Sequence, residues 1–450
     1  MNWNQLLSNK RLGQEGQSNR NDDRTEFQRD YDRLIFSAPF RRLQNKTQVF
    51  PLPGSIFVHN RLTHSLEVSS VGRSLGNDVS RLLLERHPQL IETHFSELGS
   101  IVSAACLAHD LGNPPFGHSG ENAIGTYFSE GDGQFLKHYV CEDTGDCLNP
   151  KQWEDLIHFE GNANAFRLLT HHFNGRRKGG FVMTYSTLAS IVKYPYTSDL
   201  AGDLHKFGFF RSEVEDYCKI ADELGILKLD APEGSCRYVR YPLVYLVEAA
   251  DDICYQIMDI EDAHKLKLLT TEQVRELFLN YFEENQRNLI AERMGTLDDV
   301  NEQIVYLRSC VINCLVQECV RVFVEHEDEF LSGTFPGPLI KYVAEIPRNA
   351  YMECEKVAYS SIYHCKDVVD IEIAGYKVIT QLTDLMIKAV TEPEKAFSKL
   401  LISRVSSQYQ ILAPTLYERV MAVLDYISGM TDVFALDLYR KINGMSLPDV

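Results

Sequence analysis

The spacing of apolar residues predicts helices over most of this chain. Between Thr63 and His87, apolar side chains recur every three or four residues, which places them on one face of an α-helix. A nearly all-apolar segment, SELGSIVSAACLAHDLG, predicts a buried helix that ends at Gly112 and Pro114, two residues typical of helix ends. Further helical periods cover residues 151–173, 212–224, 240–264, 271–293, 300–327, 351–390, 394–408 and 414–427.

Three segments depart from this helical pattern. Residues 1–30 are polar and charged, which predicts a mobile or partner-docked arm. The segment TQVFPLPGSIFV alternates β-forming residues around a Pro-Leu-Pro-Gly turn and predicts one short β-hairpin near residues 46–58. Residues 129–150 contain Gly, Asp and Cys without periodicity, which is typical of a surface loop. The pattern as a whole predicts a mostly α fold in a single globular unit.

Composition narrows the class of protein. The hydrophobic fraction of 44% and the charged fraction of 24% are ordinary for a soluble globular chain. A formal net charge of −18 argues against a protein that coats nucleic acid, because such proteins need arrays of Lys and Arg. The eleven cysteines form no CxxC pair, and no apolar signal segment or long apolar run is present. We therefore expect a cytoplasmic protein with free thiols and no membrane span.

The pair His109-Asp110, at the end of the buried apolar helix, is the first candidate for chemistry. Alone, this pair fits a histidine near a helix end and a capping aspartate as well as it fits a metal site. Two further residues favour the metal: His64 at the start of another amphipathic helix, and Asp251 inside an otherwise apolar helix. Two imidazoles with two carboxylates suit Mg²⁺, Mn²⁺ or another first-row transition metal, whereas the absence of Cys ligands disfavours structural zinc.

The residues after this pair predict an acid/base group. Pro114-Pro115 prevents the helix from continuing, and Gly117 frees the backbone, so a new helix can start near His118. Glu121 then lies on the same helix face as His118. A carboxylate beside an imidazole orients it and raises its basicity, as general acid/base catalysis requires. The alternative is that His118 only caps the helix.

The spacing of acidic residues in the helix at 240–264 selects one aspartate. Asp251, Tyr255 and Asp259 are four residues apart and share one helix face. Asp252 is rotated by about 100° from that face. We therefore predict Asp251 as the metal ligand and expect Tyr255 and Asp259 to line the same pocket. The alternative, a solvated acidic face, is disfavoured by the apolar residues that surround these positions.

Long motifs occur in a fixed order along the chain. They are RLTHSLEV at 61–68, HDLGNPPFGHSGE at 109–121, HFEGNANAFRLL at 158–169, KYP at 193–195, EAADDICY at 248–255 and DYISGMTD at 425–432, preceded by RDYDRLIFSAPFRRLQNKTQVFP at 29–51. Over about residues 24–440 the chain thereby resembles the dGTP triphosphohydrolase (dGTPase-like dNTPase) family of the HD superfamily.

This resemblance implies an HD-domain helical fold and a domain order. We expect an N-terminal arm and hairpin at residues 1–60, an HD metal-binding catalytic core at 61–265, and a C-terminal helical region at 266–450 packed on that core. The implied activity is the hydrolysis of deoxynucleoside triphosphates, dGTP among them, to the deoxynucleoside and inorganic tripolyphosphate. The base that is preferred is left open.

The resemblance also implies roles for individual residues. His64, His109, Asp110 and Asp251 match the metal ligands, and His118 with Glu121 matches the catalytic pair. The substrate-binding positions are Gln48 for the sugar 3′-OH, Arg61 and Lys193 for the phosphates, Asn162 near the phosphates, and Tyr255 and Asp259 around the sugar, where the tyrosine ring can exclude a 2′-OH.

The resemblance also implies partners, and two alternative functions stay open. The implied partners are a dNTP substrate, an activator nucleotide and further copies of the chain in a homo-oligomer such as a hexamer. One alternative is an HD phosphohydrolase for nucleoside monophosphates or cyclic phosphodiesters, although Gln48, Arg61 and Lys193 favour a triphosphate. A second is a nucleotide- or single-stranded-DNA-sensing module, which the acidic net charge and the complete ligand set disfavour.

Overall fold

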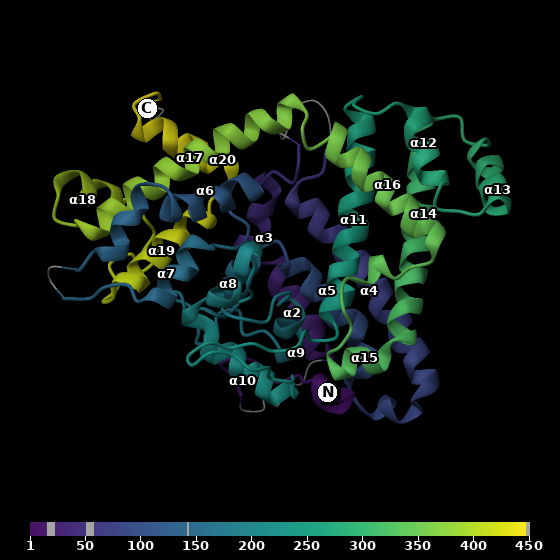
Figure 1. Ribbon diagram of the computed structural model, residues 1–450, viewed down its shortest axis with the longest axis horizontal. Coiled ribbons are helices and arrows are strands. Elements are labelled where there is room, and N and C mark those ends of the chain that lie inside the picture. The colour runs from purple at the N-terminus through teal and green to yellow at the C-terminus, as the bar shows by residue number, and fades with distance from the viewer. Residues whose placement is uncertain (16–22, 51–57, 142–143, 447–450) are drawn as a thin grey trace.

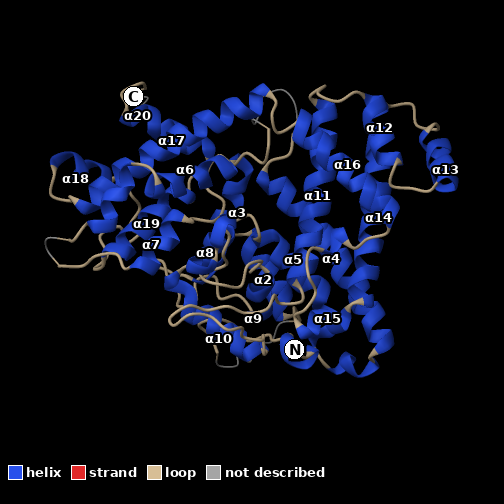
Figure 2. Ribbon diagram, viewed as in Figure 1, coloured by secondary structure: helices blue, strands red, loops and turns tan. Residues whose placement is uncertain are grey.

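Helices make up nearly all of the regular structure in a computed structural model of the protein (Figure 1). The structure describes residues 1–15, 23–50, 58–141 and 144–446. Within these ranges no β-strand is formed, and isolated bridges are the only β-type pairing (Figure 2). The predicted mostly α fold is therefore confirmed. Among the described helices, none combines the length and the apolar composition needed to cross a membrane.

The α-helices follow one another along the chain and are joined by turns, short 3-10 helices and longer loops. The first ten are α1 (Trp3–Leu6), α2 (Glu26–Ile35), α3 (Ala38–Arg42), α4 (Arg61–Arg86), α5 (Leu98–Ala108), α6 (Gly117–Ser129), α7 (Pro150–Ile157), α8 (Gly161–Thr170), α9 (Tyr185–Ser190) and α10 (Val214–Leu224). The others are α11 (Val244–Lys265), α12 (Thr271–Leu279), α13 (Glu284–Met294), α14 (Val300–Glu325), α15 (Glu327–Ser332), α16 (Glu345–Ser361), α17 (Lys366–Thr391), α18 (Ala396–Ser403), α19 (Leu416–Ser428) and α20 (Asp432–Ile442).

Buried apolar side chains form two cores. The first lies among α4, α5, α11 and α14, and the second lies among α6, α7, α17 and α19 on the other side of the molecule (Figure 1). Helices α4 and α5 approach closely because both carry glycine at their contact. A Cβ atom on Gly76 would lie only 2.8 Å from the backbone of Gly99. Helix α4 packs in the first core and α6 packs in the second core.

Some predicted helices are divided in the structure. The periods predicted over 151–173, 271–293 and 351–390 each contain two helices, with breaks at residues 158–160, 280–283 and 362–365. At the first break Glu160 caps α8, because its carboxylate accepts hydrogen bonds from the backbone N–H groups of Asn162 and Ala163. Apolar spacing continues across such a break, so periodicity alone does not reveal it.

The predicted β-hairpin near residues 46–58 is not confirmed. Residues 51–57 lie outside the described residues. On either side of them a single antiparallel bridge pairs Thr47 with Asn60. Asn60 is also the N-cap of α4, where its side chain accepts a hydrogen bond from the backbone N–H of Thr63. The bridge therefore sets the start of α4 beside the segment that carries Gln48.

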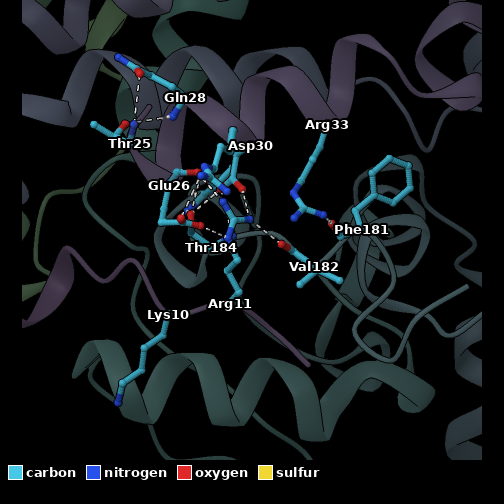
Figure 3. A network of polar contacts seen from close by, with 12 residues as sticks. Lys10, Arg11, Thr25, Glu26, Gln28, Asp30, Arg33, Phe181, Val182 and Thr184 are labelled. Carbon is cyan, nitrogen blue, oxygen red and sulfur yellow. Dashed lines mark hydrogen bonds and ion pairs between the residues drawn. The ribbon is translucent and has the colours of Figure 1, made fainter. Parts of the chain in front are cut away.

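Residues 1–15 are packed against the rest of the chain, which differs from the predicted mobile or partner-docked arm. Arg11 is only 6% exposed and lies at the centre of a polar network (Figure 3). Its guanidinium donates to Asp30 Oδ1 and to the carbonyl oxygen of Val182, each at 2.6 Å, and it also pairs with Glu26. The other oxygen of Asp30 accepts from the hydroxyl of Thr184, the N-cap of α9. The N-terminal residues thus fix the start of α9.

Replacement of Arg11 by methionine is expected to lower the free energy of unfolding by about 3–5 kcal/mol, because it leaves the buried carboxylate of Asp30 without its cation. Lys10 provides the matched control, since its side chain is 50% exposed and points away from the network (Figure 3). Lys10→Met should cost less than about 1 kcal/mol. Urea titration followed by circular dichroism compares the two variants, and equal losses would contradict this role for Arg11.

Candidate active site

Three predicted metal ligands converge from different helices. His64 comes from the first turn of α4, His109 follows α5, and Asp251 lies in α11. Asp251 Oδ1 is 3.0 Å from His64 Nε2 and 3.4 Å from His109 Nε2. One potential ligand atom from each residue lies within 4.8 Å of the others. These three side chains therefore form a compact group of two nitrogens and one oxygen.

The chemistry of this group fits a divalent cation. His109 Nδ1 donates to the carbonyl oxygen of Cys106 at 2.6 Å, which directs Nε2 toward Asp251. That buried Nε2 atom has no hydrogen-bond partner among the described residues. Burial alone would raise the pKa of Asp251, but His109 and His64 lower it well below its ordinary value. Imidazole nitrogens and a carboxylate suit first-row divalent metals, so the residues present fit such an ion.

The structure also separates Asp251 from its neighbour. Burial raises the pKa of Asp252 to about 8, so this carboxyl group is largely uncharged at neutral pH. Asp252 lines the cavity described below but does not belong to the group of three potential ligands. The predicted choice of Asp251 over Asp252 is therefore supported by position and by charge.

Asp110, the fourth predicted ligand, has different partners. Arg61 Nη1 donates to Asp110 Oδ2 at 2.7 Å, and the side-chain amide of Asn113 donates to Oδ1. Asp110 Oδ1 is 3.7 Å from His109 Nε2, at the margin of the group. The structure thus places Asp110 next to the metal-binding group while pairing it with Arg61, the predicted phosphate-binding residue.

The predicted catalytic pair lies in the first turns of α6. His118 is exposed to the cavity, and Glu121 is mostly buried behind it. Desolvation lowers the pKa of His118 below its ordinary value, and the charges of Arg61 and Lys206 act in the same direction, against Glu121. The lowered pKa favours the neutral imidazole, which is the form that can accept a proton.

A lysine that the sequence motifs did not indicate completes this part of the site. Lys206 Nζ lies 2.7 Å from Glu121 Oε1 and 2.9 Å from Glu160 Oε1. Glu121 Oε2 also accepts from the backbone N–H of Gly161 at 3.1 Å. Lys206 lies in a stretch of short turns without helical period, where no spacing marks it. Its only signal is the segment KFGFF, a cation followed by side chains that are buried.

Lys193 and Tyr255 occupy the wall next to Asp251. Lys193 Nζ is 3.0 Å from Glu248 Oε1, on the same helix as Asp251. The ring centroid of Tyr255 is 6.3 Å from that of His64 and 6.1 Å from that of Tyr363. Tyr363 follows α16 in a region without a recognised motif, so the sequence did not indicate it.

Asp259 is not among the residues that line the cavity, in contrast to the prediction. Its carboxyl group accepts a hydrogen bond from Tyr363 Oη at 2.8 Å, one helical turn beyond Tyr255. Burial raises its pKa to about 8. The shared helix face was predicted correctly, but the extra turn carries Asp259 out of the cavity wall, where it pairs with Tyr363.

Most predicted site residues surround one cavity of about 320 Å³. Both cationic and carboxylate side chains line it. Gln48 lies at its edge, with a buried Oε1 atom that has no hydrogen-bond partner among the described residues. The predicted residues that line the cavity are Gln48, Arg61, His109, Asp110, His118, Glu121, Asn162, Lys193, Asp251 and Tyr255. His64 lies behind this wall, in contact with Asp251.

Comparison with known proteins identifies two family domains in the chain. Residues 61–177 match the HD domain, and residues 344–441 match the phosphohydrolase-associated domain. The first match contains the pairs His109-Asp110 and His118/Glu121. The second contains α17, α18, α19 and most of α20, which build the second core beside α6.

Full-length relatives carry a consistent name. A deoxyguanosinetriphosphate triphosphohydrolase-like protein of Synechocystis sp. is 38% identical, over 99% of this chain and 100% of the relative. A protein of the same name from Pseudomonas aeruginosa is 37% identical over the whole of both chains. The deoxyguanosinetriphosphate triphosphohydrolase of Yersinia enterocolitica is 30% identical, over 92% of this chain and 93% of the relative. With this identity over its full length, the chain belongs to the deoxyguanosinetriphosphate triphosphohydrolase family of HD-domain hydrolases.

Proposed function

We propose that this protein hydrolyses deoxynucleoside triphosphates to the deoxynucleoside and inorganic tripolyphosphate, with the help of a divalent metal. One observation carries the proposal: His109 and Asp251 of the metal-binding group, the His118/Glu121 pair and three cations line the same cavity. A group that binds cations at one wall, beside Arg61, Lys193 and Lys206, suits a polyanionic substrate. The names of the full-length relatives support a deoxynucleoside triphosphate as that substrate.

The charge of the cavity is concentrated against an acidic background. The chain as a whole carries a formal charge of −18, so phosphate binding depends on local cations. Lys193 and Lys206 pair with Glu248 and Glu160 in the structure, and these ion pairs hold both ammonium groups at the cavity wall. A bound triphosphate would share these cations with the carboxylates. We expect Arg61 to be shared in the same way, between Asp110 and the phosphates.

His64, His109, Asp110 and Asp251 would hold the metal. When bound, a divalent ion supplies Lewis acidity toward a phosphoryl oxygen and lowers the pKa of water. Cysteine ligands are absent from the group, which supports a catalytic ion with open positions over a structural zinc ion. Mg²⁺, Mn²⁺ and other first-row ions all suit such ligands.

The proposed reaction breaks the bond between the α-phosphorus and the 5′ oxygen. Water attacks the α-phosphorus, the deoxynucleoside leaves with the 5′ oxygen, and the three phosphates leave together. His118 lines the cavity, and its lowered pKa favours the neutral imidazole, so it is suited to take the proton of the attacking water. The imidazolium formed in this way could then deliver that proton to the 5′ oxygen. Glu121, itself held by Lys206 and Gly161, would orient the histidine.

Product analysis tests this function. The protein is incubated with each of the four dNTPs, singly and in mixtures, with Mg²⁺, Mn²⁺ or Co²⁺, and the products are separated by anion-exchange chromatography. The expected products are deoxynucleoside and tripolyphosphate. Release of pyrophosphate or orthophosphate would contradict the proposed bond cleavage. Binding of single-stranded DNA without any turnover would favour a sensing module, and activity in mixtures alone would identify an activator nucleotide.

Tyr255 is expected to enforce the preference for deoxyribose. Its ring lines the cavity beside Asp251, where it would exclude a 2′-OH from a bound sugar. Exclusion of one hydroxyl group should change kcat/KM by about 100-fold. In Tyr255→Ala the ratio of kcat/KM for dGTP over GTP should fall by about that factor. Tyr359→Ala, at a side chain that is 65% exposed on α16, is the control and should keep the wild-type ratio. Equal kcat/KM for dGTP and GTP in the wild type would exclude this role.

A further inference from the structure

The turn that leads into His118 contains an unfavourable backbone conformation. Phe116, two residues before His118, has φ of 62°, in the left-handed region. A side chain with a Cβ atom rarely adopts this conformation unless its surroundings impose it. Such residues concentrate at active sites, where surrounding contacts hold them. The contacts that hold Phe116 in this conformation therefore also influence the direction of the His118 side chain.

The first contact comes from the N-terminus of α20. Asp432 is 7% exposed, and its Oδ1 atom accepts a hydrogen bond from the backbone N–H of Phe116 at 2.9 Å. Its Oδ2 atom accepts from the backbone N–H of Thr47 at 2.8 Å. One carboxylate thus joins the turn before His118 to the segment that carries Gln48, on two sides of the same cavity.

The second contact comes from α17. Gly375 is buried in the middle of this helix, and a Cβ atom there would lie 2.5 Å from Phe116 Cβ and 2.6 Å from Phe116 Cγ. Glycine is unfavourable in a helix interior, so its presence here needs a local reason. The absence of a side chain lets Phe116 rest directly on the helix. One turn earlier, the backbone oxygen of Glu372 accepts a hydrogen bond from Ser119 Oγ at 2.6 Å.

We propose that Gly375 and Asp432 are positioning residues of the active site. Together α17 and α20 hold Phe116 in its left-handed conformation, and this conformation sets the direction of His118 toward the substrate. The phosphohydrolase-associated region would then take part in catalysis by fixing the geometry of the HD domain's acid/base group. This inference rests on the proposed function of His118.

Gly375→Ala provides the main test. The added Cβ atom displaces Phe116, and a shift of the catalytic group by about 1 Å costs about 100-fold in kcat. KM for dGTP and the bound metal, measured by mass spectrometry, should change by less than about twofold, because neither the cations nor the metal-binding group is moved. Helix propensity alone would predict a more stable helix and an unchanged rate, since alanine favours helices over glycine.

A compensating substitution separates positioning from general damage. Phe116→Gly removes both atoms that would clash with the added Cβ, and glycine adopts a positive φ without strain. The double variant Gly375→Ala/Phe116→Gly should reach a kcat within about threefold of Phe116→Gly alone, as expected for two residues that act through one contact. A loss that persists in the double variant would overturn the proposal.

Two more variants complete the test. Gly295→Ala is the matched control, because Gly295 has φ of −63° and an added Cβ would meet its nearest neighbours at 3.4 Å. It should keep wild-type kcat. If Gly375→Ala does not fold, Asp432→Asn serves instead. Its amide cannot accept from both N–H groups, so kcat should fall by about tenfold with bound metal retained. Wild-type kcat in Asp432→Asn would overturn the proposal.

Measurement of tripolyphosphate release distinguishes failure of the proposed function from failure of the positioning role. All rates are measured on the product that the wild type forms. A wild type that releases no tripolyphosphate would count against the proposed function. A wild type that releases it, together with an unchanged kcat in folded Gly375→Ala, would count against the positioning role alone.

Discussion

Alanine at His109 or at Asp110 is expected to abolish metal-dependent turnover. His109 belongs to the group of three residues that converges at the predicted metal site, and its Nε2 atom lies 3.4 Å from Asp251 Oδ1. A metal bound there would stabilise the transition state by several kcal/mol, so its loss should lower kcat by roughly 10³-fold or more. Asp110 completes the predicted ligand set and orients Arg61, so its removal should have an effect of similar size.

Metal content and rate together test this expectation. Each variant is assayed for dNTP hydrolysis over a range of Mn²⁺ concentrations, and bound metal is measured by mass spectrometry after dialysis. His138→Ala, at an exposed histidine on the surface, should behave as the wild type. Near-normal rates in His109→Ala with metal supplied would show that the ligand assignment is wrong. If Asp110→Ala binds metal fully but has a low rate, the role of Asp110 is to orient Arg61 and not to bind the metal.

Alanine at His118 is expected to lower kcat by about 10²–10⁴-fold, which is the usual contribution of a positioned acid or base. His118 faces the cavity, and desolvation holds its pKa below the ordinary value, so it is available as a base at neutral pH. The metal-binding group does not include it. Bound metal and the free energy of unfolding should therefore be close to those of the wild type.

The control for this variant is another histidine. His172 is exposed and far from the catalytic pair in sequence, and His172→Ala should keep the wild-type rate. The pH dependence adds a second measurement, because removal of the base should also remove the acidic limb of the kcat profile. Loss of metal in His118→Ala would make His118 a structural residue.

Local spacing predicted those parts of the site that lie within one turn of a helix. His118 and Glu121 share a turn of α6, and Asp251 and Tyr255 share a face of α11, as their spacing required. Asp259 shows the limit of this reasoning. Its face was predicted, but its hydrogen-bond partner was not, because Tyr363 comes from a segment more than 100 residues later.

Contacts between distant segments could not be predicted from periodicity. Lys206 reaches Glu121 and Glu160 from a stretch of turns, and only the folded chain brings these three together. The same holds for the pairing of Asp110 with Arg61. Helix breaks cannot be predicted from apolar spacing for a related reason. Glu160 caps the start of α8 by accepting hydrogen bonds from backbone N–H groups, and apolar spacing does not reveal such a cap.

The hydrogen bond between Phe116 and Asp432 also bears on the order in which contacts can form during synthesis. The backbone N–H of Phe116 finds its acceptor 316 residues further along the chain. At roughly 5–20 residues per second, the ribosome needs about 15–60 s to supply that carboxylate after Phe116 has been made. The turn before His118 therefore lacks this hydrogen bond during most of translation. A nascent chain can build the α4–α5 pair early, yet it completes the contacts of this turn only after α20 emerges.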